Sequence, residues 1–308
     1  STPQLQVALE PALARVFVYG EPELPSGVTR GSAPADYLVT GVTRYTAPLR
    51  PLGLLRSGVK ETAGDGSAAA DRYPSSYLYE KWSTAAPTNF GEYLAHYTQD
   101  MVLGKTSVVL PRAAFLANEA AFDAARKSQP YYIRETTVPP TAYLVGGVPT
   151  VILRFPYIPA GLSLQGDEGW FSFDGLYYAE HELRQIIKTG KADNARLQQA
   201  VQEAALTEGS LSAPFESHGI SFHHRGYCYY TIPIRHFDDS EAPEKTAHGR
   251  YGLVRGNEYR IHLTRILRPG TALPPDLSKD QRPLTEERDL RSVVHVRPVV
   301  TRSHEAHL

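Results

Sequence analysis

The sequence predicts a mainly β protein, an antiparallel β-sandwich that carries one helical insertion. Strand-like segments occupy both ends of the 308-residue chain. Two adjacent amphipathic helices are expected between them, and strands do not alternate regularly with helices, which argues against a parallel sheet. The last eighteen residues, 291–308, repeat apolar side chains every two residues. That period is typical of a strand with one buried face.

The first half of the chain contains mostly strand signals. Leu13–Tyr19 is rich in β-branched and aromatic residues and stops at Gly20. Ala113–Lys127 is alanine-rich and lies between prolines, which predicts a short helix. The further strands that we expect in this part are Tyr37–Tyr45, Tyr131–Ile133, Ala142–Val145 and Thr150–Ile158.

The sequence predicts a helical insertion at residues of about 180–206. Glu180–Ile187 and Ala192–Leu206 each place their apolar residues on one helical face. Two strong strand signals follow, at Gly226–Phe237 and Tyr251–Leu267. In Tyr251–Leu267, apolar and polar residues alternate, which indicates one buried and one solvent-exposed face.

The C-terminal strand carries its apolar residues at even positions. A strand of this kind can pair within its own sheet or with another molecule. If it pairs with a neighbour, the residues that we expect to enter the neighbour are Val294, Val296, Pro298, Val300, Ala306 and Leu308.

The segment before this strand, 269–290, contains four prolines among charged residues and has no apolar period. It is therefore expected to be neither a helix nor a central strand. As an extended linker of about 22 residues it would reach roughly 70 Å; alternatively it wraps its own domain, and the tail completes the home sheet. The expected organisation is a sandwich domain at 1–268, a linker at 269–290 and a donor strand at 291–308.

Composition excludes several classes of protein. The 32 basic and 33 acidic residues nearly cancel, so no global field favours nucleic acid or an anionic membrane. No apolar run approaches the ~20 residues of a transmembrane helix. Cys228 is the only cysteine, and we expect it to be a small buried side chain in a strand.

Residues that bear chemistry do not form a known catalytic pattern. His223 and His224 are adjacent, and neighbouring strand residues point to opposite faces, which disfavours a shared metal ion. Asp167, Glu168 and Asp174 surround aromatic residues, as a sugar site with paired carboxylates does, and also as an ordinary polar turn does. Nucleophile-elbow, zinc-protease and phosphate-loop motifs are absent from the sequence. We expect no enzyme activity, no cofactor and no metal.

Aromatic residues leave a second functional hypothesis open. The loop-like segment 57–88 carries Trp82 and several tyrosines, and Trp170 lies among phenylalanines. Exposed rings of this kind could form a glycan-binding platform, whereas buried rings would only complete a core. A surface glycan-binding module is therefore the alternative to a strand-exchanging protein.

Three segments resemble a known family. CYYTIPIRHF at Cys228–Phe237, GRYGLVRGNEYRIHLTRILRPG at Gly249–Gly270 and the terminal strand are similar to the C-terminal part of Bacteroidales fimbrial subunits, the type V pilins. The closest similarity is to the minor-fimbria shaft subunits of Porphyromonas. ALARVFVY at Ala12–Tyr19 is similar to the strand that opens the second domain in those subunits.

The resemblance implies a transthyretin-like β-sandwich subunit of a cell-surface fimbria. In that family the precursor is exported through the outer membrane as a lipoprotein, and an arginine-specific protease removes an N-terminal strand. The C-terminal strand of a neighbour then fills the open groove. The implied partners are other fimbrial subunits and surface proteins of host or bacterial cells.

One feature departs from the family pattern. In the related subunits a whole domain precedes the ALARVFVY-like strand, whereas here only about eleven residues precede it. The chain is therefore expected to correspond to a C-terminal part or a shortened relative. It could donate a strand, but its acceptor groove is in question.

Overall fold

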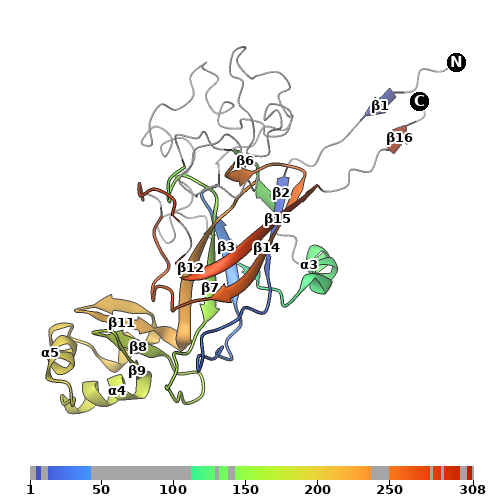
Figure 1. Cartoon of the computed structure of the whole chain (residues 1–308). Helices are drawn as coiled ribbons and strands as arrows, with labels where there is room; N and C mark the ends of the chain where they lie inside the picture. The colour runs from blue at the N-terminus through green and yellow to red at the C-terminus, as the bar shows by residue number, and fades with distance from the viewer. Residues whose placement is uncertain are drawn as a thin grey trace.

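Two four-stranded sheets, built mainly from the predicted strand segments, face each other as a β-sandwich (Figure 1). The first sheet has the order β15 (Leu290–Pro298), β14 (Asn257–Ile266), β2 (Leu13–Tyr19) and β5 (Tyr132–Arg134). The second has the order β12 (Tyr227–Pro233), β7 (Thr150–Pro156), β3 (Asp36–Thr40) and β4 (Ala113–Ala114).

The computed structural model describes the larger part of the chain. The described residues are 5–7, 13–42, 112–128, 132–137, 143–236, 250–277, 280–285, 288–298 and 304–306. Trp82 and the end of the expected strand Tyr37–Tyr45 lie outside them. Within the described part, no helix is long and apolar enough to cross a membrane.

Pairing within the two sheets is antiparallel with one exception. β2 and β14 run parallel, with Arg15 opposite Glu258 and Val18 opposite Ile261. This pair joins the N-terminal part of the chain to its C-terminal part in the middle of the first sheet. The predicted sandwich is confirmed, and it contains one parallel pair that the sequence did not indicate.

The core lies between the two sheets and is filled from both. Alternation along β14 places Tyr259, Ile261 and Leu263 in this core, as the sequence predicted. β2, β3, β7 and β12 fill the remainder with Val16, Val18, Tyr37, Val39, Val151, Leu153, Phe155, Cys228, Tyr230 and Ile232. Cys228 is buried, which confirms its expected role.

Residues 170–223, which contain the two predicted helices and four short strands, form a second, smaller packing unit, which we call the insertion. Its sheet has the order β10 (Phe215–Ser217), β11 (Ile220–His223), β8 (Trp170–Phe173) and β9 (Leu176–Ala179). Helices α4 (Glu180–Thr189) and α5 (Ala195–Glu203) pack against it and confirm the predicted helical pair. Between and after these elements lie the 3-10 turns η5 (Glu208–Ser212) and η6 (His224–Gly226).

Local sequence explains where the two helices begin and end. The Glu182 carboxylate accepts the Ala179 backbone N–H at 2.7 Å at the start of α4, and Gly190 ends α4 at φ 67°. The Asn194 side chain accepts the backbone N–H groups of Arg196 and Leu197 at the start of α5. These contacts satisfy donors that a helix leaves unpaired at its ends.

Two of the predicted elements are only partly correct: the expected helix Ala113–Lys127 is helical only in its second half, and the expected strand Ala142–Val145 is not a strand in its described residues. In the expected helix Ala113–Lys127, Ala113 and Ala114 pair with β3, and Asn118 then caps a 3-10 turn, η3 (Glu119–Ala121), before α3 (Phe122–Ser128). Tertiary pairing therefore overrides the helix propensity of the alanines. The expected strand Ala142–Val145 contains only one bridge, from Leu144 to Pro283, in its described residues. A short pair, β6 (Thr136–Thr137) with β13 (Gly252–Leu253), completes the body.

Candidate functional site

The C-terminal strand β15 lies at the edge of the first sheet. It pairs antiparallel with β14, with Val294 opposite Ile261 and Val296 opposite Tyr259. The register shifts between Leu263 and Arg265, which marks an irregularity near the beginning of β15. In the isolated chain, this part of the tail therefore completes the home sheet.

The predicted alternation is confirmed for the part of the tail whose side chains are described. Val294 and Val296 are half-buried and pack against the sandwich core, whereas Val293 on the other face is 41% exposed. Pro298 ends β15 opposite Asn257. Val300 and Leu308 lie outside the described residues.

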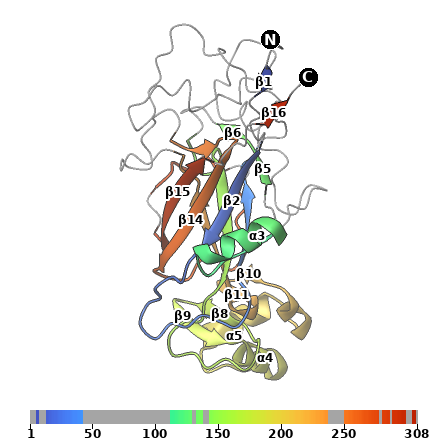
Figure 2. The same cartoon turned by 90° about the vertical axis from the view of Figure 1, so that its right-hand side faces the viewer.

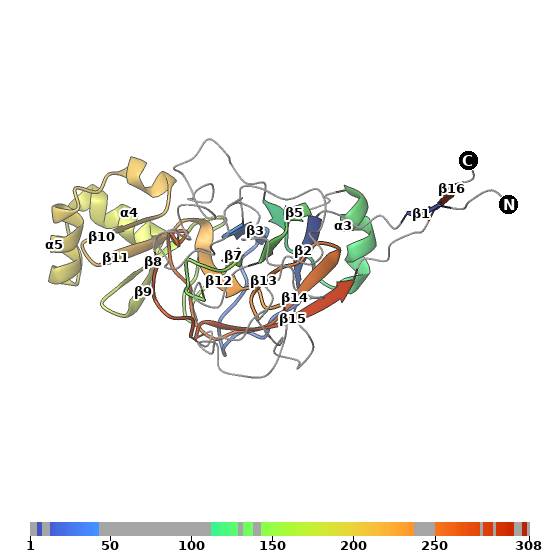
Figure 3. The same ribbon diagram turned by 90° about the horizontal axis from the view of Figure 1, so that it is seen from above.

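Ala306 belongs to a short strand beyond β15. This strand, β16 (His304–Ala306), pairs antiparallel with β1 (Leu5–Val7), so that Ala306 lies opposite Leu5. Figures 1 and 3 show the two strands together, away from the sandwich and at the opposite end from the insertion. Three residue pairs in an isolated two-stranded ribbon are marginal in water.

The proline-rich segment 269–290 lies against its own body in its described parts. Ala272, Leu277 and Leu284 are buried. Thr271 exchanges backbone hydrogen bonds with Tyr229 at 2.9 and 3.1 Å, on the outer edge of β12. In the isolated chain, the described parts of this segment therefore wrap their own domain. The segment covers the edge of β12, which would otherwise be open.

A buried carboxylate organises the outer face of the first sheet. Glu258 accepts hydrogen bonds from Arg126 at 2.6 and 2.9 Å and from Arg260 at 2.8 Å. Burial alone would raise the pKa of Glu258, but the hydrogen bonds from the two guanidinium groups outweigh it and lower the pKa. Glu258 also lies opposite Arg297 of β15. The sequence analysis did not single out this network.

The same network holds α3 on the sheet. Phe122 of α3 stacks on Phe17 with ring centroids 5.0 Å apart and meets Tyr19 edge-on. Figure 2 shows α3 lying across β2. The Tyr19 hydroxyl donates to Glu119 at 3.0 Å, and burial together with this contact raises the pKa of Tyr19. α3 thus closes an aromatic surface that β2 would otherwise expose.

Trp170 is fully buried, so it cannot act as a glycan platform. It stacks on His223 at 3.7 Å, and its indole N–H donates to the Tyr157 carbonyl at 2.7 Å. The His223 Nδ1–H donates to the Tyr227 carbonyl at 3.0 Å, and burial lowers the pKa of His223 to about 4. These rings join the insertion to the sandwich, which corrects the platform hypothesis for Trp170.

The carboxylates around Trp170 are separately engaged in contacts at the surface. Asp167 binds Arg225 at 3.2 Å, Asp174 binds Arg196 at 2.9 Å, and Glu168 contacts His181. The other two histidines in this region, His218 and His224, contact Ser217 and the Leu211 carbonyl. In the described part of the chain no three potential ligands come together as a metal site.

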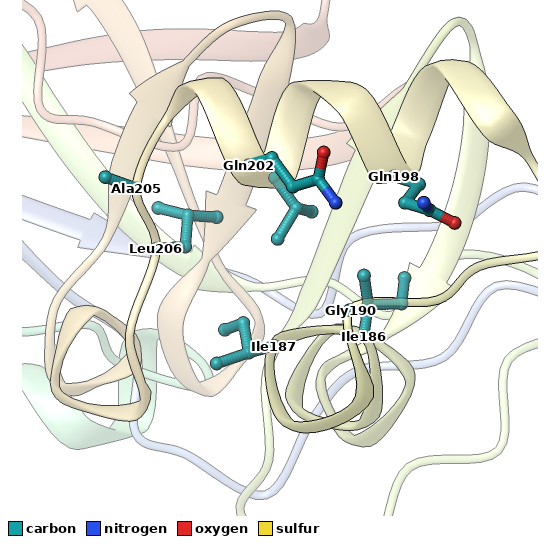
Figure 4. A pocket seen from close by; sticks show the side chains of 8 residues that line it. Ile186, Ile187, Gly190, Gln198, Gln202, Ala205 and Leu206 are labelled. Carbon is teal, nitrogen blue, oxygen red and sulfur yellow. The ribbon is translucent and has the colours of Figure 1, made fainter.

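A crevice of about 240 Å³ lies between α4 and α5 (Figure 4). Its walls are mainly aliphatic, and the only polar side chains that line it are those of Gln198 and Gln202. The lining therefore offers neither an acid–base group nor an aromatic platform. The complete lining is Ile186, Ile187, Gly190, Gln198, Val201, Gln202, Ala205 and Leu206.

Comparison with known families identifies the part of the chain that contains β15. The family described as major fimbrial subunit protein type IV, fimbrillin, C-terminal matches residues 221–305. The C-terminal region is therefore similar to a fimbrillin C-terminal domain, which supports a fimbrial subunit. A search of curated proteins finds no match.

The fimbrillin C-terminal match runs through β11, β12, β13, β14 and β15. It thus contributes one edge strand to each sheet of the sandwich, β12 and β15. Fimbrillins are structural subunits of surface fimbriae, so the match supports a fimbrial structural subunit. The family is non-enzymatic.

Proposed function

We propose that this fimbrial subunit polymerises by donating its C-terminal strand to a neighbouring subunit and that the resulting fibre supports adhesion. The observation that carries the proposal is the position of β15, an edge strand with a two-residue apolar period that is followed by the tail segment with β16. Extended peptides bind open sheet edges through backbone hydrogen bonds and alternate side-chain pockets. The β15 side of the molecule is therefore the donor side.

The donor strand has two parts in this proposal. Val294 and Val296 pack on the home core and anchor β15 to β14, while the residues that follow Pro298 reach the neighbour. Val300, Ala306 and Leu308 continue the same period and are the side chains that enter the neighbouring sandwich. The division into body (1–268), linker (269–290) and tail (291–308) belongs to this proposal, with the linker as a strap across β12.

Apolar burial and backbone pairing together stabilise the complex. Burying the two large apolar side chains Val300 and Leu308 at ~1.5 to 3 kcal/mol each contributes about 3 to 6 kcal/mol before ordering terms, and the smaller Ala306 adds less. Ordering the tail opposes part of this gain, and the β1–β16 pair must open. Backbone pairing over the whole donor strand fixes its register.

The experiment compares two substitutions on opposite faces of the tail. Val300→Asp places a charge on the face that enters the neighbour, and Thr301→Asp places the same charge on the opposite face. We expect Val300→Asp to abolish denaturant-resistant complexes with a protease-matured fimbrial subunit and Thr301→Asp to retain them, because burial of an unpaired carboxylate is strongly unfavourable. Equal complex formation by both variants would refute strand donation by this face.

Adhesion and outer-membrane export complete the proposal. The family assignment to surface fimbriae supports both. We expect fibres assembled from the wild-type chain to bind surface proteins of host or bacterial cells, and the unassembled Val300→Asp chain to bind them more weakly because it is monovalent. Equal binding by the fibre and the monomer would show that adhesion does not depend on polymerisation.

A further inference from the structure

The four-stranded sheet of the insertion has one face that α4 and α5 do not cover. The two helices pack on the side formed by Phe171 and Phe173 of β8 and Phe222 of β11 (Figure 1). Because side chains alternate along a strand, the residues between these apolar positions point to the opposite face. There the register aligns one residue of each strand in a single row, which we call the polar row: Glu216, Ser221, Ser172 and Tyr177.

Each member of the polar row presents a polar group that is not used within the fold. Glu216 and Tyr177 are exposed, and the two serines are half-buried. In the part of the chain that the structure describes, none of the four side chains has a hydrogen-bond or ion-pair partner. Neighbouring strands lie about 4.8 Å apart, so the row is about 14 Å long. It therefore offers hydroxyl groups and a carboxylate along the length of a short extended ligand.

The aromatic ring at one end of the polar row is held in place from below. Tyr177 is 41% exposed and meets the buried Trp170 edge-on, with ring centroids 5.4 Å apart and an angle of 89° between the rings. Trp170 is itself fixed by its stacking on His223. A single perpendicular contact covers at most one face of the Tyr177 ring, so the other face is left for a ligand. Trp170 is thus the support of an aromatic platform that Tyr177 provides.

We propose that the polar row binds a neutral glycan, with a galactose ring stacked on Tyr177. The face of an aromatic ring carries partial negative charge and attracts polarised C–H groups. Galactose presents several of these groups together on one side of its ring. The next sugar of the chain then lies over Ser172 and Ser221, whose hydroxyls match sugar hydroxyls because both donate and accept.

Glu216 at the other end of the row adds selectivity. Its carboxylate accepts hydrogen bonds from a neutral sugar but repels an acidic one. This binding activity goes beyond the proposed fimbrial assembly. It belongs to the insertion of a single chain and requires neither the C-terminal tail nor a neighbouring subunit.

Saturation-transfer NMR of the full chain with free lactose tests the platform. We expect Tyr177→Ala to weaken lactose binding about tenfold or more, because the stacked area is lost. Tyr177→Phe keeps the ring and should retain most of the binding. In the wild type, saturation should be strongest at the C–H protons of the galactose ring.

A second pair of variants tests the carboxylate. Glu216→Ala should weaken lactose binding by about tenfold, because a hydrogen bond to a charged acceptor is lost. Sialyllactose, which carries an acidic sugar, should bind the wild type more weakly than lactose does. Glu216→Gln should narrow this difference, since it removes the repulsion and keeps an acceptor oxygen.

Controls separate binding from folding and from other aromatic side chains. Tyr132→Ala removes a tyrosine that is 51% exposed on β5 of the sandwich, and it should bind lactose like the wild type. Urea unfolding midpoints show that all variants fold. Val300→Asp should also bind free lactose like the wild type, because binding of a single free sugar does not depend on assembly.

No lactose binding by the wild type, or wild-type binding by Tyr177→Ala, would overturn the glycan proposal. Equal losses in Tyr132→Ala and Tyr177→Ala would overturn it as well. Denaturant-resistant complexes are scored separately. A chain that binds lactose but forms no such complexes refutes strand donation alone, and a chain that forms them without binding lactose refutes the glycan site alone.

Discussion

The Arg255 guanidinium donates from Nε to the Glu135 carboxylate at 2.8 Å, with both side chains almost completely shielded from water. The Arg255 backbone N–H donates to the same carboxylate at 3.1 Å. A single acidic group thus fixes both the backbone and the side chain of the residue that leads into β14.

Removal of this carboxylate should strongly destabilise the fold. We expect Glu135→Ala to lower the free energy of unfolding by about 3 to 5 kcal/mol, because it removes a buried carboxylate that binds the buried Arg255 guanidinium. Glu23→Ala is the matched control: its partner Arg265 is half exposed, and the expected change is below about 1 kcal/mol. Urea titrations of both variants measure the two changes in the free energy of unfolding. Equal decreases would contradict the idea that burial makes the Glu135–Arg255 pair more important for stability than the exposed Glu23–Arg265 pair.

The Glu258 network should make stability depend on acidity. The folded-state pKa of Glu258 is lowered from 4.5, so its stabilising contribution is present above that value and is lost as the pH falls through the folded-state pKa. We expect Glu258→Gln to be less stable than the wild type by about 1 to 3 kcal/mol at neutral pH. Urea unfolding at several pH values should show this difference shrink below about pH 4.5; a constant difference would exclude the ionised carboxylate as its source.

His223 should give a second, distinct pH dependence. Its pKa is about 4 in the folded protein against 6.5 for an ordinary histidine, so the unfolded chain binds more protons between these values. The free energy of unfolding should therefore rise with pH from about 4 to 6.5, by up to about 3 kcal/mol. NMR titration of the imidazole checks the pKa directly. His223→Leu should remove this slope, and an unchanged slope would assign it to another group.

Gly270 should control how the strap lies on β12. A Cβ at this position would stand 2.2 Å from the Tyr229 carbonyl oxygen, which accepts the neighbouring Thr271 N–H at 3.1 Å. We expect Gly270→Ala to lift the strap locally and to speed hydrogen exchange at Thr271 and Tyr229. Gly209→Ala, where the nearest atom is 3.6 Å away, should leave exchange at both sites unchanged. Protection equal to the wild type in Gly270→Ala would show that the strap tolerates a side chain here.

Local pattern was sufficient for much of the fold. The apolar content of Leu13–Tyr19 predicted β2 with its observed bounds, and one apolar face predicted each of α4 and α5. The prediction of a helix at Ala113 and Ala114 failed because these residues pair with β3. Their partners lie about 77 positions away, and local helix propensity carries no information on such distant pairing. The parallel pairing of β2 with β14 is equally non-local.

Prediction of the site was uneven for the same reason. The alternation at Val294 and Val296 was visible because a strand face is a local pattern. Glu258 and Arg260 also alternate with buried residues, but their partner Arg126 comes from α3, so only the assembled fold reveals the network. The sequence alone did not show whether Trp170 is buried or exposed. In the structure Trp170 stacks on His223 and is fully buried.

The parallel β2–β14 pair has a consequence for how the chain acquires its fold. Arg15 and Glu258, which face each other in this pair, are separated by 243 positions in the sequence. A nascent chain has therefore made most of its length before the centre of the first sheet can form. Pairing over such a long separation slows folding and leaves early strands exposed. The first sheet should therefore stay incomplete until β14 is made.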